Sequence, residues 1–431
     1  MTRWLALVLF LLTVGACAED WPEMQGAGRR SVWNETGILR QFPAEGLLVS
    51  WRVPIGGGFS GPAVAGGRVF VSDYLKADDG GRERVLCLDE ATGQVLWTHE
   101  NPAADYTGFA YNSGPRATPT VSGDQVYVLG AAGDLYCLEA TTGALVWQVS
   151  YQNDFGAKLP TWGFSGAPLV VGEVVVCAVG GTGNARLVGL GAATGKEVWR
   201  ALPSAGDIGY SSPMLVNAAG VDQVIHWVAG EVAAVDPRTG AVLWQQPFPS
   251  DIPVATPTVE GDRLLVSDFY KGALMLRLKA DEPGVEVLWQ VGGANELNTD
   301  GLHALMCTPV IMDSCIYGVC SYGQFRCLDA VTGQRLWESM EVTKEQVRWA
   351  NAFVTRQGDV LFMNNDRGEL IIAAPTAEGY RELARTELIK PTTGGAGSRE
   401  RGLVNWVMPA YANRHLITRN DEEIIRVSLA E

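Results

Sequence analysis

From about residue 46 onward, apolar and polar residues alternate in short runs that are separated by turn-forming residues. In the stretch 118–149, the runs TPTVSG, QVYVLG, DLYCLEA and ALVWQV are divided by Gly- or Asp-bearing turns at 122–124, 131–134 and 141–143. Alternation with a period of two places the apolar side chains on one face of a strand. The stretch therefore predicts four short antiparallel strands joined by tight turns.

One hairpin phrase returns along the chain and ends each time in a Trp. CLDEATGQVLW at 87–97 is rewritten at 137–147 and 327–337, and looser copies occupy 190–199 and 235–244. Thr can hydrogen-bond the local backbone and Gly tolerates positive φ, so the Thr-Gly pair predicts the turn of the hairpin. A large flat side chain on the outer strand can fill the wedge between neighbouring repeats, and its indole N–H then needs an acceptor. We expect this blade-docking role for Trp51, Trp97, Trp147, Trp199, Trp244, Trp289 and Trp337.

A second landmark is a small residue before Pro at the start of an alternating run, as in TPTV at 118–121 and 256–259. Seven runs start in this way, and an eighth at 351–362 starts without the Pro. A repeat of 45 to 52 residues, the spacing of the recurring Trp residues, indicates a repeat architecture rather than separate domains. Four-stranded antiparallel repeats are typical of β-propeller blades. The sequence thus predicts an all-β, eight-bladed propeller over residues 46–431.

The two ends of the chain complement each other. The last repeat stops one strand short at 414–430, whereas GLLVSWRVPI at 46–55 has no hairpin partner. Pairing these segments would close the ring and remove two exposed sheet edges. Residues 19–45 would then form an extended, Trp-anchored lead-in across one face.

The first 18 residues have the pattern of an export signal, with a basic residue before an apolar run at 5–14 that is too short to span a membrane. Two processing patterns remain open. Residues 14–17 resemble a lipoprotein box, in which Cys17 would carry lipid, whereas 16–18 also fit ordinary signal cleavage. Either pattern predicts an exported protein, in the periplasm or anchored to the outer membrane. No later stretch is long and apolar enough for a transmembrane helix.

The net charge of the chain limits the kinds of molecule that it can bind. Its 431 residues carry a formal charge of −15, and 47% of them are hydrophobic. An acidic surface disfavours nucleic acid and anionic lipid. We therefore expect a monomer that binds an envelope protein or a small ligand.

The A-x-T-G-x-x-x-W phrase resembles the repeat of the pyrroloquinoline-quinone (PQQ) propeller family over nearly the whole chain after the signal. The lead-in WPEMQGAGRRSVWNETGIL (21–39) and the ending 412–430 are similar to planctomycete-type PQQ-binding-like repeat proteins. The family includes quinoprotein dehydrogenases and a non-enzymatic lipoprotein of the β-barrel assembly machinery. The resemblance implies the fold and leaves the function open.

Quinoprotein dehydrogenases typically place a vicinal Cys-Cys disulfide against PQQ and use carboxylate and amide ligands for Ca²⁺. This sequence has no adjacent cysteines and no haem-binding C-x-x-C-H. The nearest approach to a Ca²⁺ loop is NELNTD at 295–300, and a polar inter-blade loop explains it better. We expect no cofactor and no metal site, with PQQ and Ca²⁺ as the alternative.

Eight cysteines in an exported chain raise the question of disulfides. Cys87, Cys137 and Cys327 share one repeat position, which small buried hydrophobes explain. Cys320 and Cys327 flank a short turn and could face each other across the hairpin, either as a disulfide or as two buried thiols.

The loops that enter the inner strands converge on one face, where ligands usually bind in closed β-architectures. Residues there are rich in aromatics, which either pack the funnel or recognise a partner. The leading hypothesis is a non-enzymatic exported propeller that binds protein or a small ligand. The alternative is a divergent PQQ-dependent oxidoreductase, and a carbohydrate-binding protein is a third reading. The candidate binding residues are Tyr111, Asn112, Arg116, Trp162, Tyr210, His303, Trp349, Asn351 and Trp406, with no catalytic residue among them.

Overall fold

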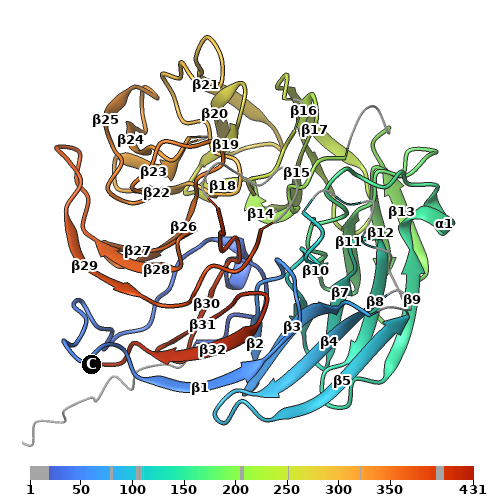
Figure 1. Cartoon of the computed structure of the whole chain (residues 1–431). Coiled ribbons are helices and arrows are strands. Elements are labelled where there is room, and N and C mark those ends of the chain that lie inside the picture. The colour runs from blue at the N-terminus through green and yellow to red at the C-terminus, as the bar shows by residue number, and fades with distance from the viewer. Residues whose placement is uncertain are drawn as a thin grey trace, which may run out of the picture.

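The computed structural model describes residues 19–77, 81–102, 106, 109, 111–203, 208–250, 252–320, 322–394 and 402–431. In this part of the chain, thirty-two strands accompany one short α-helix, α1 (Tyr151–Phe155), and one 3₁₀ turn, η1 (Ala27–Arg29). The strands form eight four-stranded sheets, which surround a central axis (Figure 1). The predicted eight-bladed, all-β propeller is confirmed. The expected export signal and Cys17 lie outside the described residues.

Every blade is an antiparallel sheet whose first strand lies innermost, and blades one to four follow the chain in order. They consist of β2 (Ala63–Ala65), β3 (Arg68–Leu75), β4 (Arg82–Asp89) and β5 (Val95–Pro102); β6 (Thr120–Ser122), β7 (Gln125–Leu129), β8 (Asp134–Glu139) and β9 (Leu145–Ser150); β10 (Leu169–Val171), β11 (Val174–Ala178), β12 (Leu187–Gly191) and β13 (Glu197–Ala201); and β14 (Met214–Ala218), β15 (Val221–Val228), β16 (Glu231–Val235) and β17 (Val242–Pro247).

Blades five to seven repeat this order, and the eighth blade combines the two ends of the chain. They consist of β18 (Thr258–Glu260), β19 (Arg263–Asp268), β20 (Gly272–Leu278) and β21 (Val285–Val291); β22 (Val310–Met312), β23 (Cys315–Val319), β24 (Phe325–Asp329) and β25 (Arg335–Ser339); β26 (Ala352–Gln357), β27 (Val360–Asn365), β28 (Glu369–Ala373) and β29 (Glu382–Glu387); and β30 (Ala410–Ala412), β31 (His415–Arg419), β32 (Glu423–Ser428) and β1 (Val49–Pro54).

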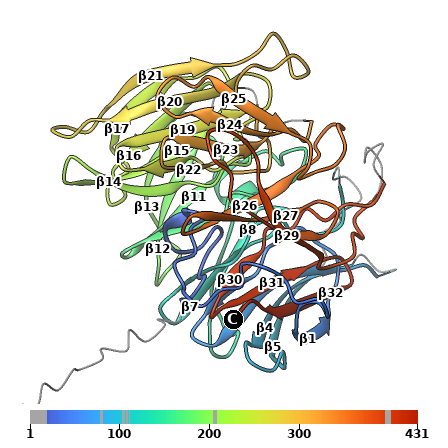
Figure 2. The same ribbon diagram turned by 90° about the vertical axis from the view of Figure 1, so that its left-hand side faces the viewer.

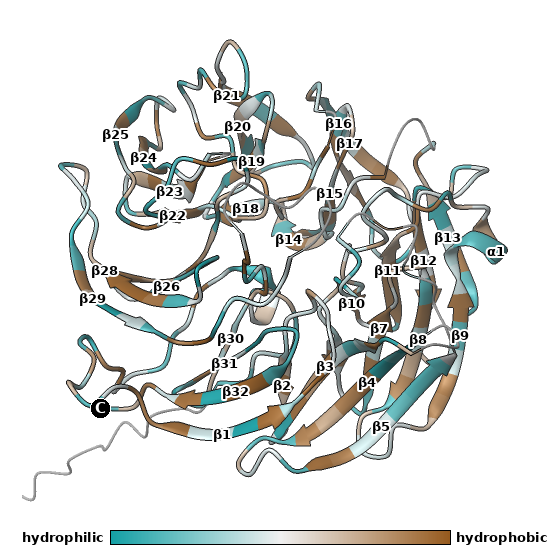
Figure 3. Ribbon diagram, viewed as in Figure 1, coloured by the Kyte–Doolittle hydropathy of each residue, from teal (hydrophilic) through white to brown (hydrophobic). Residues whose placement is uncertain are grey.

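The core lies between neighbouring blades, because the middle strands are packed on both faces. All five residues of β11 are buried, whereas the outer strand β13 alternates exposed and buried positions. Figure 3 shows apolar residues along the strands of every blade and hydrophilic residues in many of the outer connections. Full burial of a middle strand explains its near-continuous apolar sequence.

The recurring cysteine lies opposite the recurring Trp of the same blade. Cys137 pairs with Trp147 across β8 and β9, and a bulge follows directly. Cys87 and Cys327 pair in the same way with Trp97 and Trp337. The same position opposite a Trp holds Gly189, Ala234 and Met275 in three other blades. It is therefore a buried position packed against the indole, and the recurrence of Cys follows from packing rather than from thiol chemistry.

Each Trp also reaches the following blade. The Trp97 indole donates to the Ala140 carbonyl in the next Thr-Gly hairpin at 3.0 Å, and its ring lies where a side chain on Gly143 would stand, 2.6 Å from an ideal Cβ. The same pairing of an indole with a hairpin carbonyl joins Trp51 to Glu90, Trp147 to Ala192, Trp199 to Pro237, Trp289 to Ala330 and Trp337 to Thr376.

Trp244 departs from this pattern, and the next hairpin, at 279–284, contains no Thr-Gly. Its indole donates instead to Oε1 of Gln223 in its own blade, at 2.7 Å. The hairpin that accepts from Trp337, at Thr376, also lacks Thr-Gly, so what the contact requires is a hairpin carbonyl within reach of the indole.

The ring closes as the chain ends predict. β1 pairs antiparallel with β32, so the N-terminal strand completes the last blade. Arg419 is fully buried at the seam between blades eight and one, where it donates to the Ser72 carbonyl at 2.7 Å and to the Gly56 carbonyl. These bonds satisfy a cation that is costly to bury alone.

The lead-in crosses the face that carries the hairpins between first and second strands. Trp21 exchanges backbone hydrogen bonds with Val64 of β2, and η1 lies at the centre of the ring (dark blue in Figure 1). Arg29 is buried there and donates to the carbonyls of Ala167, Pro168 and Pro213 at 2.5–3.1 Å. Seen from the side, the N-terminal segment lies within the stack of blades (Figure 2). The segment is thus a plug as well as a lead-in.

The cysteines are free in the described residues. Of the two alternatives for Cys320 and Cys327, the structure has two buried thiols and no disulfide, because their side chains lie on opposite faces of the sheet and belong to different apolar clusters. Cys327 pairs with Tyr317, and Cys320 lies in the turn beyond β23. In the described chain, no helix has the length and apolar character needed to cross a membrane.

Gly143 and Gly123 offer a matched test of the contact between Trp and the next hairpin. Both have positive φ, but a Cβ on Gly123 would meet nothing within 4 Å. We expect Gly123→Ala to lower the free energy of unfolding by about 1 kcal/mol through backbone strain. Gly143→Ala should cost about 2–4 kcal/mol, since Trp97 must also move. Urea denaturation measures both, and equal losses would contradict the proposed role of the ring.

Candidate functional site: the axial pit

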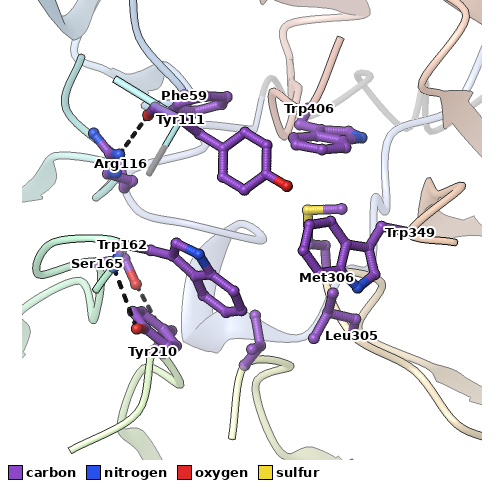
Figure 4. Close-up of a pocket in the computed structure, with 11 residues that line it drawn as sticks. Phe59, Tyr111, Arg116, Trp162, Ser165, Tyr210, Leu305, Met306, Trp349 and Trp406 are labelled. Atoms are coloured by element: carbon purple, nitrogen blue, oxygen red, sulfur yellow. Dashed lines mark hydrogen bonds between the residues drawn. The ribbon is translucent and has the colours of Figure 1, made fainter. Parts of the chain in front are cut away.

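The connections that lead from one blade into the inner strand of the next converge around the axis and enclose a pit. Its upper chamber has a volume of about 170 Å³. Figure 4 shows the side chains arranged around it in the order of the blades. The lining residues are Phe59, Tyr111, Arg116, Trp162, Ser165, Tyr210, Val254, Leu305, Met306, Trp349 and Trp406.

A lower chamber of about 130 Å³ continues the pit along the axis. It shares seven wall residues with the upper chamber, and the hydroxyl side chains of Thr118, Ser212, Thr256 and Thr308 join them. Met24 of the lead-in also lines this chamber, and Ser212 donates to its sulfur at 3.9 Å. The N-terminal plug therefore gives the pit its floor.

The two chambers follow from the alternation of side chains along the inner strands. The residues one and three positions before the Pro of each inner strand point toward the axis, because side chains alternate with period two. The position three before Pro supplies the apolar upper wall, as at Phe59 and Val254. The position one before Pro supplies the hydroxyls, as at Thr118 and Thr256.

Four aromatic rings form a collar around the upper chamber. Trp162 and Trp349 meet edge to face with centroids 6.0 Å apart, Trp349 and Tyr111 at 5.8 Å, and Tyr111 and Trp406 at 5.4 Å, with interplanar angles of 70–79°. Tyr210 packs beside Trp162 at 4.9 Å. The loops that carry Trp162 and Trp349 belong to blades on opposite sides of the ring, so the collar spans the mouth.

Two collar residues hold strained backbone conformations. Tyr111 has φ of 57° and Trp349 has φ of 68°, the left-handed region that bulky side chains rarely adopt. Such strain persists only when surrounding contacts impose it, and it concentrates at ligand-binding positions.

Arg116 stands at the wall of the pit, beneath the collar. Its guanidinium carbon lies 5.3–5.6 Å from the ring centres of Phe59, Tyr106 and Phe109, and Nη2 donates to the Tyr111 carbonyl at 2.6 Å. Burial lowers the pKa of Arg116 to about 10, so the group stays charged at pH 7. Arg116 therefore holds the strained Tyr111 segment in place.

The polar loop at 295–300 is occupied by its own contacts. Asn295 accepts two backbone N–H bonds within the loop, and Glu296 forms an ion pair with Arg348 at 3.1 Å. The Arg348 guanidinium also lies 5.1 Å above the Trp349 ring. Among the described residues, no three His, Cys, Asp or Glu side chains cluster as a metal site would require. The loop thus buttresses the collar.

Six of the nine residues predicted from sequence meet in the pit. They are Tyr111, Arg116, Trp162, Tyr210, Trp349 and Trp406.

The other three do not line it. Asn112 is exposed and is not among the lining residues. His303 is fully buried, its Nδ1 lies 3.0 Å from the Phe269 carbonyl, and burial lowers its pKa. Asn351 is buried, and its backbone N–H donates to Oδ2 of Asp366 at 3.3 Å. Position before an inner strand places a residue near the axis, but the path of the loop decides which way the side chain points.

Five of the lining residues were not predicted from the sequence: Phe59, Ser165, Val254, Leu305 and Met306. A signal for four of them was present, since Phe59, Ser165, Val254 and Met306 each stand three residues before the Pro of an inner strand. Ranking positions by this offset, rather than by aromatic character, would have found them.

The pit does not fit PQQ. A planar tricarboxylate needs several cationic or amide donors and a flat slot, and its Ca²⁺ needs oxygen ligands. In the described upper chamber, Arg116 is the one cationic side chain, none of the lining side chains is a carboxylate or amide, and the collar rings meet edge to face. No catalytic step through PQQ follows from these residues.

The fold and the site define this protein as an eight-bladed β-propeller with a blind, largely apolar axial pit. A sequence profile of the family described as "Outer membrane protein assembly factor BamB" matches residues 43–113 and 81–339, which together exceed half of the chain. The chain belongs to this family, and the family resemblance drawn from the repeats is confirmed.

Several curated proteins that are similar to this chain are also described as BamB. The chain is 26% identical over 283 residues to outer membrane protein assembly factor BamB of Burkholderia pseudomallei, covering 63% of this chain and 66% of that protein. It is 25% identical to BamB of Shewanella oneidensis, covering 78% and 80%. Quinoprotein alcohol dehydrogenase PedH of Pseudomonas putida is 29% identical over 203 residues, covering 42% and 30%. The chain spans just under two thirds of the length of the Burkholderia relative.

Solved structures support the fold. BamB from Moraxella catarrhalis superposes with a TM-score of 0.60 at 15% identity, covering 89% of this chain and 99% of that chain. Quinohemoprotein alcohol dehydrogenase from Comamonas testosteroni gives 0.66 at 14% identity, covering 97% and 82%. At these identities the similarity concerns the architecture alone.

Arg116→Lys tests the bond network at the wall of the pit. Lys keeps the charge but lacks the planar fork that stacks on rings and donates to carbonyls. We expect a loss of about 1–3 kcal/mol in the free energy of unfolding, together with a changed near-ultraviolet circular dichroism signal from the collar. Arg238→Lys, whose side chain is 83% exposed, is the control and should stay within about 0.5 kcal/mol. Equal effects of the two variants would show that Arg116 holds nothing in place.

Proposed function

We propose that this chain is a non-enzymatic scaffold of the cell envelope that binds a protein partner through its pit face. The observation that carries the proposal is an aromatic pit whose lining, in the described residues, holds no His, Cys, Lys, Asp or Glu side chain and no metal-ligand cluster. Aromatic side chains around a pocket are the usual composition of protein-recognition hot spots. The family and the three BamB relatives support the same role, since assembly of outer membrane proteins requires binding between proteins.

The location follows from the same comparisons and from the sequence. An envelope position is what the BamB relatives suggest, and the signal pattern of the first 18 residues supports export. Residues 19–22 contact the face opposite the mouth of the pit, through the hairpins of Gly66 and Asn413. A lipid on Cys17 would therefore tether the protein without covering the pit.

A PQQ-dependent oxidoreductase is the weaker alternative. The quinoprotein relatives share 42% or less of this chain, and the lining of the pit offers neither the donors for three carboxylates nor the ligands for Ca²⁺. The similarity to quinoprotein dehydrogenases is what supports this alternative, and the residues that line the pit are what count against it.

Photo-crosslinking in cells tests the scaffold. Benzoylphenylalanine replacing Leu159, which is 45% exposed on the loop that carries Trp162, should form a covalent adduct with an envelope protein. The same label at Val242, which is 45% exposed on the outer strand β17, should not form this adduct. The physical reason is that the loop of Leu159 borders a concave aromatic surface, whereas Val242 lies on an outer strand. Adducts from Val242 alone, or none from either position, would refute binding through the pit.

The anchor is tested by labelling cells with a palmitate analogue. We expect the mature protein to take up the label and Cys17→Ser to lose it, because lipid can be attached only to the thiol of that cysteine. Ordinary signal cleavage predicts an unlabelled wild-type protein, which would remove the lipid anchor from the proposal. Thermal stability, measured for both forms, controls for misfolding.

A further inference from the structure

The size of the pit limits its occupant to one ring-sized group. The upper chamber measures about 170 Å³, and an apolar protein cavity of about 150 Å³ accommodates one benzene molecule. The lower chamber adds about 130 Å³. It shares seven wall residues with the upper chamber, so the occupant can extend along the axis. The N-terminal plug with Met24 ends the path, which excludes a chain that threads through the ring.

The chemistry changes with depth. The upper wall is aromatic and aliphatic apart from Arg116 and Ser165, whereas four more threonine and serine hydroxyls line the lower chamber. A ring with a polar tip matches this order, because its apolar body contacts the collar while its tip meets hydroxyl groups. Aromatic side chains with an O–H or N–H usually find such a partner when buried.

The charges around the pit exclude other ligands. Arg116 in the wall and Arg348 above the Trp349 ring disfavour an organic cation, which an aromatic cage would otherwise attract. Both arginines already bind protein acceptors, so a polyanion gains little. A sugar would need many polar partners, and few polar side chains line the upper chamber.

The strained collar favours a site that is shaped for an occupant. Tyr111 and Trp349 are 238 positions apart, yet their rings touch and both backbones hold left-handed conformations. Each left-handed conformation is costly for a bulky side chain, so chance does not explain why two such residues meet at the axis. The two rings meet at an interplanar angle of 70° in the lining of the pit, where an inserted group would contact both.

From these observations we infer that the pit is an anchor site for one aromatic side chain with a polar tip, tyrosine or tryptophan, presented by the partner protein. This inference rests on the proposed scaffold function and adds the chemistry of the contact. The ring of the anchor lies within the collar, and its O–H or N–H reaches the hydroxyls of Thr118 and Thr256. Buried aromatic anchors of this kind supply much of the binding energy at protein interfaces.

Small probes test the chemistry without the partner. Titration of the purified protein with p-cresol and toluene, followed by tryptophan fluorescence and thermal shift, compares a ring with and without a polar tip. In a wholly apolar cavity, burying the unpaired hydroxyl would make p-cresol at least tenfold weaker than toluene. We expect p-cresol to bind as tightly as toluene, within threefold. Tenfold weaker binding of p-cresol, or no binding of either probe, overturns the inference.

Two further variants locate the probe. The double variant Thr118→Val/Thr256→Val keeps the shape of the pit and removes two hydroxyls. We expect it to weaken p-cresol about tenfold and to leave toluene unchanged. Val254→Trp fills the pit and should abolish both probes, whereas Leu297→Trp, at a residue 58% exposed outside the pit, should leave both unchanged. Probe binding that survives in Val254→Trp places the probe elsewhere and overturns the inference.

The partner experiment separates this inference from the scaffold itself. With the photo-crosslinker at Leu159 beside the pit, Val254→Trp should reduce the adduct to the envelope protein at least tenfold, and Leu297→Trp should not. An undiminished adduct in Val254→Trp overturns the aromatic anchor while the scaffold function stands. Probe binding without any envelope adduct overturns the protein source, and the pit then takes a free aromatic compound.

Discussion

The contact that six of the repeat Trp residues make with the hairpin of the next blade is the constraint on which the rest of the structure depends. The indole donates to a carbonyl of that hairpin, and the hairpin Gly leaves room for the ring, as at Trp97, Ala140 and Gly143. Because this contact joins neighbours along the chain, it sets how each blade is placed against the next. Repetition of one local geometry produces a closed ring with a single axis.

The central axis exists only because the ring of blades closes. Two buried arginines stabilise places that the Trp contacts do not reach: the seam between blades eight and one, and the centre of the ring. Arg419 binds carbonyls across the seam where blade eight meets blade one, and Arg29 binds three carbonyls of blades three and four from inside the channel. Neither residue belongs to the repeat. Arg29 brings the lead-in into the axis, so a potential channel becomes a pit with a floor. The repeated residues therefore build the ring, and single residues shape the site.

Much of the architecture could be predicted because its determinants are local. Alternation, the Thr-Gly hairpin and the Trp spacing are read along the chain, and they predicted eight blades and closure by the strand at 46–55. The sequence left open whether Cys320 and Cys327 form a disulfide or two buried thiols, and the hairpin register decided for the thiols by placing the two side chains on opposite faces of the sheet. A symmetric flank around a turn does not reveal that register.

The sequence by itself determined the fold, the family and six of the pit residues, since the loops that enter the inner strands converge near the axis. Only the tertiary structure decided which side chains point inward: it buried His303 and Asn351, and it brought in Val254 and Met306. It also placed Tyr111 against Trp349 and closed the pit with Met24. The reason is physical. Strand patterns depend on residues close together in the sequence. The pit is lined by loops from eight blades, and the packing of these loops against one another depends on residues far apart in the sequence.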